Sequence, residues 1–495
     1  MSVRHPTRPG MVIAMRWRSN LRENETSGAR EQLGWFATLF AMGLTFHYSD
    51  SQPLAVTPVL LAGLPALLFP GSAVAAGLVL VAAATVAARS LPAASNHLML
   101  SLLIAFALGG AALWARVTRD PANNADGFVD RWLDGARTPV GLTVLVVYLF
   151  TVFDKLNTAY FDPATSCGGE LFNQLLWLNG LGAVVIPPAL DQFLAVAAVL
   201  IEAAILGLLA VPRLRYRGIL LGFAFHSVLA WASFYDFATI MFAVYLLLIP
   251  RRVFTDLGSR TVLRGCALTG FTVHVLLSVT TLESFTGPFG VPWHTLMVVS
   301  WFLAVGPVML AVLRAYRAAP TAGIETPGWR LQPVVLLLVP ALALANGLTP
   351  YLGLKTVANY SMFSNLHTEE GRTNHLVPGV TAIALADPQR TTVTLVGLEF
   401  PDGTEIPPAV HRQTRWLNED PPVRIPWLEL RRAVLLWQRA GIGGIRIAYL
   451  RDGERRVVDD ATVDPVLSAP LPWWQRQLLA FRAVDSGWGP DACRW

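Results

Sequence analysis

The chain has 495 residues, of which 54% are hydrophobic and 14% are charged, and its mean hydropathy is +0.48. A soluble globular chain carries about 25% charged residues. The composition therefore excludes a disordered chain, a disulfide-stapled secreted domain and, despite the net charge of +5, a nucleic-acid-binding protein. It predicts a protein that crosses a lipid bilayer several times.

The N-terminal segment 1–32 carries six arginines and lacks an apolar stretch before a cleavage site, so we expect a cytoplasmic segment rather than a signal peptide. Long apolar runs then recur between residues 33 and 348, and each predicts a membrane-spanning helix. These runs lie near 33–48, 54–69, 72–88, 97–117, 139–154, 189–211, 262–282, 291–313 and 331–348. The apolar stretch 171–186 starts and ends on the same side, which indicates a re-entrant or interfacial segment.

The apolar run 218–249 is long for one crossing and short for two, and arginines flank it on both sides. Cytoplasmic loops carry the excess of Lys and Arg, so both ends of this run should be cytoplasmic. The run must then cross twice, or enter and return, with Asp236 near the outer tip. This gives ten or eleven crossings, with the N-terminus inside and the C-terminus outside.

From residue 349 onward the pattern becomes more polar, with turns and alternation. The expected elements are a strand at Thr391–Phe400, a helix at Trp427–Arg439, a hairpin of Ile445–Leu450 and Arg455–Val458, and a helix at Trp473–Arg482. The predicted fold is thus an all-α polytopic membrane bundle over 33–348, followed by a small extracytoplasmic α+β domain over 349–495.

Three cysteines do not make a disulfide framework. The topology places Cys167 and Cys493 on the same oxidising side, and whether they form a disulfide stays open at this point. Cys266 lies in or near the membrane.

Ionisable side chains inside apolar spans are expensive and usually face a cavity or a partner. They are His47, His97, Lys155, Glu202, His226, Asp236 and His274. The topology lets four of them, His97, Lys155, His226 and Asp236, converge on one cavity open to the outer side. A structural role is the alternative for each: snorkelling for Lys155 and His47, packing for His226, and hydrogen bonding between helices for Glu202 and Asp236.

Lys155 and Lys355 are the two lysines of a chain that otherwise uses arginine. Codon bias in a GC-rich genome explains the overall preference. Arginine cannot lose its proton near neutral pH, whereas a desolvated lysine can. Lys155, at the rim of a span, is therefore a candidate general base, while Lys355 is more simply explained by a structural or interfacial role.

Three stretches carry a family resemblance: "SNHLMLSLLIAFAL" with Asn96 and His97, "VYLFTVFDKLNTAYFDP" with Lys155 and Asn157, and "FAFHSVLAWASFYDFATIMFAVYLLL" with His226. A weaker one is "TPYLGLKTVANYSMFSNLHTEEGRTNHL". Together they resemble the vitamin K-dependent gamma-carboxylase family and its relatives with the horizontally transferred transmembrane (HTTM) domain. The resemblance covers roughly residues 33–380.

The resemblance implies a quinol-dependent carboxylase or epoxidase of the lyase or monooxygenase type. It makes Lys155 the base on a reduced vitamin K-type quinone (phylloquinol or menaquinol) and His97, held by Asn96, its helper. Asn157 and His226 would shape the quinone pocket. Asn96, and Asp236, which the topology places at the same cavity, complete the expected substrate-binding residues. O2 would give the epoxide, and CO2 would add to a glutamate of a protein or peptide substrate on the outer face.

The resemblance has limits, because the segment "DPATSCGGELF" after the lysine departs from the animal enzymes and no docking groove for a propeptide is recognisable. Quinol deprotonation can thus be retained without glutamate carboxylation. The alternative function is a non-catalytic or transport protein that uses the same polar cavity for a lipid or small solute. Both alternatives place the chain in the lipid bilayer as a multi-pass protein of the bacterial inner membrane. No motif predicts a metal site, a nucleotide site or a nucleic-acid partner.

Overall fold

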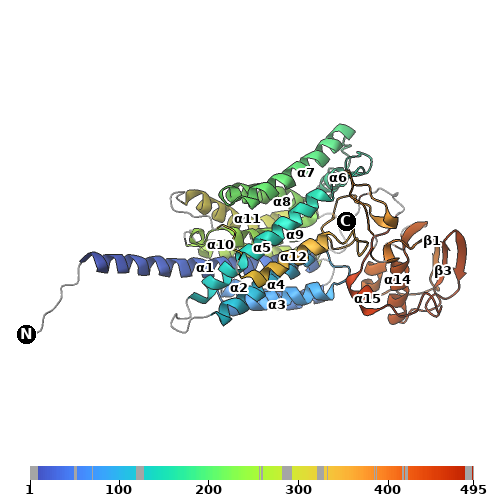
Figure 1. Cartoon of the computed structure of the whole chain (residues 1–495), viewed down its shortest axis with the longest axis horizontal. Coiled ribbons are helices and arrows are strands. Elements are labelled where there is room, and N and C mark those ends of the chain that lie inside the picture. The colour runs from blue at the N-terminus through green and yellow to red at the C-terminus, as the bar shows by residue number, and fades with distance from the viewer. Residues whose placement is uncertain are drawn as a thin grey trace, which may run out of the picture.

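The structure is a computed structural model, and it shows an apolar helical bundle with a small sheet at one end (Figure 1). The described residues are 9–49, 53–69, 71–118, 127–255, 257, 260–280, 292–319, 328–331, 333–383, 385, 387–414, 417, 422–484 and 493. We call the end of the bundle that carries the sheet the domain end, and the opposite end, where α1 (Pro9–Ser49) protrudes, the N-terminal end.

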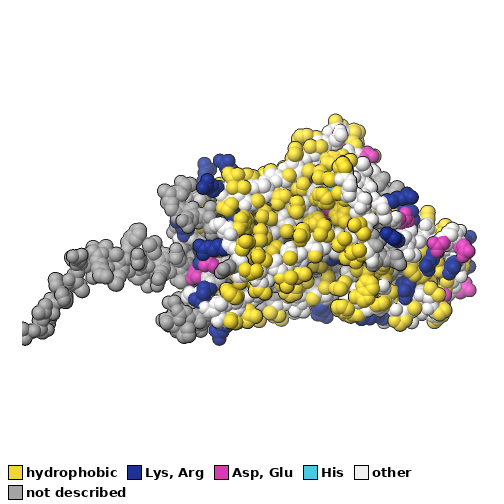
Figure 2. Space-filling view, viewed as in Figure 1, with side chains coloured by type: hydrophobic (Ala, Val, Ile, Leu, Met, Phe, Trp, Pro, Cys, Tyr) yellow, Lys and Arg dark blue, Asp and Glu magenta, His cyan; other side chains and the backbone are white. Residues whose placement is uncertain are grey.

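The bundle is built from the apolar runs that the sequence predicts as spans. Its helices after α1 are α2 (Pro53–Leu68), α3 (Ala73–Arg89), α4 (Asn96–Val117), α5 (Phe128–Phe153), α6 (Cys167–Leu178), α7 (Pro188–Ala210), α8 (Arg215–Leu229), α9 (Tyr235–Leu248), α10 (Arg260–Thr280), α11 (Trp293–Ala318) and α12 (Leu338–Gly347). Figure 2 shows a broad band of hydrophobic side chains on the visible face of this bundle, with charged side chains toward its two ends. Such a band is what a lipid bilayer requires.

Six segments of the described residues are long and apolar enough to span a membrane. They are α4, α5, α7, α10, α11 and the combined run Pro212–Leu248. Three shorter apolar helices accompany them: Thr57–Leu68, Ala73–Arg89 and Val334–Gly347. The structure therefore supports a multi-pass membrane protein, and the number of ten or eleven crossings stays a prediction.

The run Pro212–Leu248 folds back on itself. The break is the short π-helical segment Ala230–Phe234, where Ser233 adopts a φ of 80°. Phe223 before the break packs on Phe242 after it, with ring centroids 4.9 Å apart. Gly222 lies so close to Tyr245 that an added Cβ would overlap the tyrosine hydroxyl. The predicted return within 218–249 is thus a helical hairpin, α8–α9, with Asp236 beside its tip.

Charged side chains hold the N-terminal end together. Glu31 on α1 pairs with Arg260 at 3.2 Å and with Arg264 at 3.1 Å. Arg251 bonds to Asp130 and Asp134 at the start of α5. The buried amide of Gln32 donates to the carbonyls of Leu246 and Ile249 and thereby caps the C-terminus of α9. Ion pairs and a helix cap therefore hold the helices together at the N-terminal end.

The C-terminal sheet is antiparallel, with strand order β2-β1-β3-β4. Its strands are β1 (Thr392–Glu399), β2 (Val423–Pro426), β3 (Arg446–Arg451) and β4 (Glu454–Val458), and its helices are α13 (Pro408–Thr414), α14 (Trp427–Arg439) and α15 (Trp473–Leu478). Leu430, Val434 and Trp437 recur at helical spacing on α14 and pack in the core of the sheet. Asp452 and Gly453, both at positive φ, form the hairpin turn that the sequence predicts.

The prediction for this region was right for β1, the β3–β4 hairpin and α14. It missed β2, a strand of four residues that ends in a proline. It also made the last helix too long, because α15 ends at Leu478 and Leu479 is extended. Beyond α15, the backbone of Ala480 accepts from Thr356, which ties the C-terminal segment to the domain end of the bundle.

Candidate functional site

Lys155 lies just beyond the end of α5, at the domain end of the bundle, and is 5% exposed. Its Nζ donates to Glu202 Oε2 on α7 at 2.8 Å and to the Thr151 carbonyl at 3.1 Å. Glu202 is 8% exposed, so both charges of this pair are buried. Two buried opposite charges stabilise each other, and removing one leaves the other unpaired in the apolar interior of the protein.

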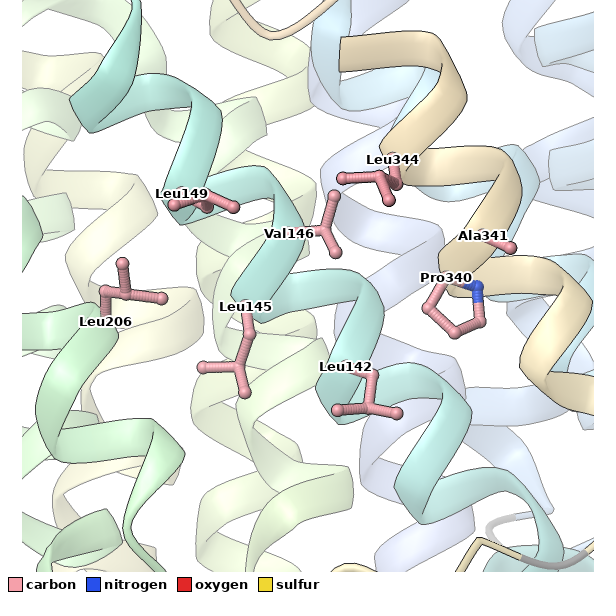
Figure 3. Close-up of a pocket in the computed structure, with 8 residues that line it drawn as sticks. All are labelled: Leu142, Leu145, Val146, Leu149, Leu206, Pro340, Ala341 and Leu344. Carbon is pink, nitrogen blue, oxygen red and sulfur yellow. The ribbon is translucent and has the colours of Figure 1, made fainter. Parts of the chain in front are cut away.

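An open apolar groove runs along α5 (Figure 3). It has a volume of about 360 Å³ and lies between α7 and α12. Its lining residues are Leu142, Leu145, Val146, Leu149, Leu206, Pro340, Ala341 and Leu344. Glu202 precedes Leu206 by one helical turn on α7, and Leu149 lies one turn before the end of α5. The groove therefore ends about one helical turn from the ion pair, which does not line it.

His226 on α8 forms a second buried polar cluster. Its Nε2 is 2.7 Å from the Tyr148 hydroxyl, and that hydroxyl also contacts the hydroxyl of Tyr245. The Nδ1 atom of His226 is buried and has no hydrogen-bond partner among the described residues. Tyr148, Thr151 and Lys155 follow one another at spacings of three and four on α5, so this cluster and the ion pair share one face of that helix.

His97 lies in a third cluster. Its Nε2 is 2.8 Å from His47 Nδ1, 3.2 Å from Asp236 Oδ2 and 3.0 Å from Ser95 Oγ. His47 Nδ1 is also 2.8 Å from Asp236 Oδ2. We call His47, His97 and Asp236 the trio. Its members come from the end of α1, the start of α4 and the start of α9, and they meet at the domain end.

The ring of Phe237 separates the trio from the His226 cluster. Its centroid is 6.3 Å from that of His97 and 5.1 Å from that of His226. Among the described residues, the hydrogen bonds and ion pairs of Lys155 go to Thr151 and Glu202 and to neither histidine. The four residues expected in one cavity are thus gathered at one end of the bundle, but in three adjacent clusters.

Asn96 and Asn157 fix the loop that covers the domain end. The side-chain oxygen of Asn96 accepts from the Tyr360 backbone at 2.6 Å. Asn157 donates to the carbonyls of Asp154 and Ser364 and accepts from Tyr160 and Asn374.

Four non-glycine residues of this loop have positive φ angles: Ala358, Tyr360, Phe363 and Asn365. Such strain persists where the surroundings impose it, and the two asparagines supply part of that constraint.

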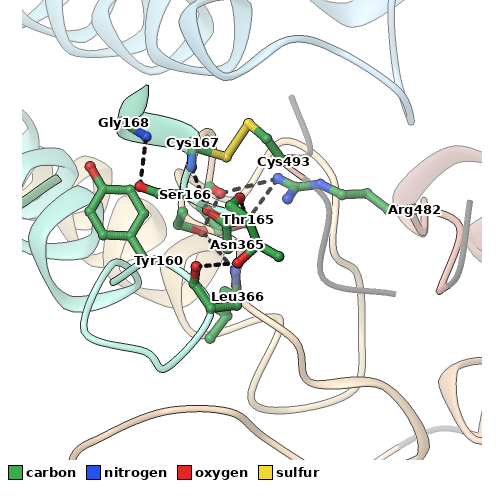
Figure 4. Close-up of a disulfide and its surroundings, with 12 residues drawn as sticks. Tyr160, Thr165, Ser166, Cys167, Gly168, Asn365, Leu366, Arg482 and Cys493 are labelled. Atoms are coloured by element: carbon green, nitrogen blue, oxygen red, sulfur yellow. Dashed lines mark hydrogen bonds between the residues drawn. A yellow bond between two sulfur atoms is a disulfide. The ribbon is translucent and has the colours of Figure 1, made fainter. Parts of the chain in front are cut away.

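A disulfide joins Cys167 at the start of α6 to Cys493, with the two Cα atoms 4.8 Å apart (Figure 4). Cys167 packs with Ala195 and Val199 on α7, three residues before Glu202. Asn365 accepts from the Cys167 backbone and donates to Thr165. The disulfide therefore ties Cys493 to α6, which packs against the helix that carries Glu202.

Lys355, the second lysine, lies in the loop after α12 and is 7% exposed. The hydrogen bond of its amine among the described residues goes to the Ala358 carbonyl at 3.3 Å. Burial lowers the pKa of Lys355 from 10.5 to about 8. Its surroundings thus differ from those of Lys155, which has a carboxylate partner.

Sequence reasoning identified Glu202 and His47 as ionisable but assigned neither to the site, and it did not single out Tyr148 or Tyr245. The one available signal was the spacing of Tyr148, Thr151 and Lys155 on a predicted helix. The partners of His47, Lys155 and Tyr148 lie 189, 47 and 97 residues away in the chain. Such pairs depend on how helices pack, which a single sequence does not specify.

No protein-family model matches this chain, and neither the curated proteins nor the solved structures contain a match. The site is therefore interpreted from its own geometry.

Proposed function

We propose that this protein is an integral membrane enzyme that binds a lipid-soluble quinol and removes a proton from its hydroxyl group at the Lys155–Glu202 pair. The observation that carries the proposal is a buried ion pair about one helical turn beyond an open apolar groove. The isoprenoid tail of a phylloquinol or menaquinol suits a groove lined by leucines. Its hydroxyl group requires polar partners, which the pair supplies.

The two charged groups divide the chemistry between them. A quinol hydroxyl resembles a phenol, whose pKa is about 10, so it loses its proton readily only if the resulting oxyanion is stabilised. In the pair, the Glu202 carboxylate accepts the proton and the Lys155 ammonium stays beside the oxyanion. This division differs from the role first expected for Lys155, in which its amine is itself the base. Here Glu202 takes that role and Lys155 stabilises the oxyanion.

The histidines contribute indirectly in this proposal. Tyr148 connects His226 to the face of α5 that carries Lys155, so His226 shapes the wall behind the pair. His97 and Asp236 lie beyond Phe237 and do not meet the quinol head. The family resemblance adds the later steps, in which the quinol anion reacts with O2 to give an epoxide and a glutamate takes up CO2.

We infer the orientation of the protein in the membrane from the different chemistry of the two ends of the bundle. Arg251, Arg260 and Arg264 lie at the N-terminal end, and cytoplasmic loops carry the excess of basic residues. The disulfide lies at the other end, and disulfides persist in oxidising compartments. The N-terminus is thus cytoplasmic and the sheet extracytoplasmic, as in a bacterial inner-membrane protein.

The test supplies purified full-length protein in lipid nanodiscs with reduced menaquinone or phylloquinone and O2, and measures quinone epoxide by mass spectrometry. We expect epoxide from the wild type and a loss of about 100-fold or more in Lys155→Ala and Glu202→Gln, the range for a positioned acid or base. The matched control is Lys355→Ala, which removes the other lysine and should keep the activity. Absence of epoxide from the wild type, or equal epoxide from Lys155→Ala, rejects the proposal.

Transport of a lipid or small solute is the second candidate, and the break in the α8–α9 hairpin favours it, because transporters often build sites at broken helices. It predicts flux into proteoliposomes that depends on Glu202 or Asp236 and does not depend on quinone. A screen in which neither substitution changes the uptake of any solute counts against it.

A further inference from the structure

The trio is the one group of three or more His, Cys, Asp or Glu side chains within the described residues that could hold a metal ion. Its three facing atoms are His47 Nδ1, His97 Nε2 and Asp236 Oδ2, and they form a triangle with sides of 2.8, 2.8 and 3.2 Å. The rings of His47 and His97 meet edge to face, with centroids 4.3 Å apart.

Hydrogen bonds do not satisfy all three contacts of this triangle when the Asp236 carboxylate is ionised. A ring nitrogen of a neutral imidazole carries either one proton or one lone pair. If both nitrogens donate to the ionised carboxylate, two N–H groups face each other at 2.8 Å. If one of them does not donate, its lone pair faces the carboxylate oxygen instead. With an ionised carboxylate, each assignment of protons therefore leaves one of the three contacts without a hydrogen bond, and Ser95 Oγ, 3.0 Å from His97 Nε2, is a further partner of that nitrogen.

A metal ion removes this conflict because all three atoms then present lone pairs to one cation. Bonds of about 2.1 Å at right angles hold two ligand atoms about 3 Å apart, which matches the sides of the triangle. Two imidazoles and one carboxylate on one face of an octahedral ion, with the opposite positions open, are the ligand set of non-haem Fe(II) sites, and two histidines with one carboxylate also bind catalytic zinc.

The fold builds the trio from rigid parts. Asp236 lies in the first turn of α9, directly after the break of the hairpin, and its Oδ1 accepts from the Phe237 backbone at 2.6 Å. This leaves Oδ2 for the trio and orients it, as outer hydrogen bonds do for metal ligands. Gly43, one turn before His47, lets α1 approach α9, because an added Cβ would lie 3.1 Å from the Asp236 carbonyl.

The trio is also accessible. The side chain of His47 is 25% exposed, whereas those of His97 and Asp236 are 11% and 12% exposed. A structural metal site is closed by its protein ligands, while a site with three protein ligands and an open side keeps positions for water or a small ligand.

From these observations we propose that His47, His97 and Asp236 bind one divalent transition-metal ion, of the Zn²⁺ or Fe²⁺ class, at the domain end of the bundle. Imidazole ligands favour these ions over Mg²⁺ and Ca²⁺, which prefer oxygen. The proposal is independent of the quinol chemistry, because the trio is separated from the Lys155–Glu202 pair by Phe237 and the His226 cluster.

The experiment measures metal content by plasma mass spectrometry on full-length protein purified without a polyhistidine tag, stripped with a chelator and reloaded with Zn²⁺. We expect about one Zn²⁺ per chain in the wild type and a fall in affinity of more than about 100-fold in His47→Ala, His97→Ala and Asp236→Asn, beyond the 10- to 100-fold cost of losing an outer partner. Mg²⁺ should not compete. The matched control is His274→Asn, a buried histidine that contacts Met297 and Ser300 and packs against Phe46, and it should retain the metal.

A second measurement needs no variant. Co²⁺ added to the stripped wild type should give the weak absorption bands of a site with nitrogen and oxygen ligands. The charge-transfer band of a thiolate ligand should be absent, because the free cysteine, Cys266, is not part of the trio. A thiolate band, a wild type without stoichiometric metal, or unchanged Zn²⁺ affinity in the folded trio variants would overturn the proposal. Loss of metal with retained epoxide formation, or the reverse, separates this proposal from the proposed function.

Discussion

The Lys155–Glu202 pair and the trio lie at the same end of the bundle, yet they solve the problem of buried polar groups in different ways. The pair joins opposite charges from α5 and α7, and each contact it makes is complementary. The trio joins three hydrogen-bonding atoms from α1, α4 and α9, each within 3.2 Å of the other two. One cluster is therefore complete within the protein, whereas the other is the metal site proposed above.

The two clusters also face different surroundings. The pair lies beside a groove lined by aliphatic side chains, and the disulfide segment packs against its helices. The trio is partly open, and Phe237 is the wall between it and the His226 cluster. A lipid-soluble substrate therefore suits the first cluster and a hydrated ion suits the second. The following predictions test this division.

The largest effect is expected when the pair is broken on one side. Lys155→Ala leaves Glu202 buried without its partner and should lower the free energy of unfolding by about 3–5 kcal/mol. The double variant Lys155→Met/Glu202→Met buries no charge and should regain most of that stability while staying inactive. Thermal unfolding of the detergent-solubilised variants provides the measurement, and a double variant as unstable as the single one would argue against a buried pair.

Removal of the disulfide should affect the function of the Lys155–Glu202 pair more than metal binding by the trio. Cys167→Ser/Cys493→Ser should cost about 2–4 kcal/mol of stability and reduce quinol turnover, because Cys167 packs on α7 near Glu202. The Zn²⁺ affinity should stay within a factor of about two of the wild-type value, since the trio lies on other helices. Equal losses of turnover and of Zn²⁺ affinity would show that the two clusters are not separate.

Metal binding should stabilise the folded protein, and this stabilisation should depend on the trio and not on the Lys155–Glu202 pair. Zn²⁺ at 100 times its dissociation constant should raise the free energy of unfolding by about 2.7 kcal/mol. The increase should persist in Lys155→Met/Glu202→Met and vanish in His97→Ala. A scan of unfolding temperature against Zn²⁺ concentration measures it, and an increase that survives in His97→Ala would place the ion elsewhere.

The last prediction concerns Lys355, a buried amine without a carboxylate partner among the described residues. Its pKa is lowered to about 8 in the folded chain, from the 10.5 of an unperturbed lysine side chain. Between these two values the unfolded chain binds more protons, so stability should rise with pH from about 8 to 10.5, by at most about 1.4 kcal/mol per pH unit. Lys355→Met should abolish this slope. A slope unchanged in Lys355→Met would assign it to another group.

Much of the bundle was predictable because apolar runs and arginine-rich loops are local signals. The return of the chain near Asp236 followed from arginines on both sides of one long run, and the hairpin α8–α9 has that shape. Strand β2 was missed because four residues are too few to show alternation. The disulfide was left open because its two cysteines are 326 residues apart.

The site was predictable only in part. Sequence reasoning selected ionisable residues in apolar spans and so found Lys155, His97, His226 and Asp236. It expected one cavity and no metal, because helix packing decides which of these side chains meet and the trio has no short ligand spacing. Asn96 and Asn157 were expected in the quinone pocket, and the structure places both in contacts that hold the covering loop.

The most direct test of the proposed function is to locate a quinol on the protein. A menaquinol analogue with a photoreactive group in its tail can be cross-linked to the wild type in nanodiscs, and the labelled residues can be identified by mass spectrometry. Quinol binding at the pair predicts labels on Leu145, Leu149, Leu206 and Leu344 in the groove beside α5. A second apolar groove, of about 510 Å³, lies between α3 and α4 near Arg116 and Trp132. Labels confined to that groove, or labelling that excess unlabelled quinol does not reduce, would contradict quinol binding at the pair.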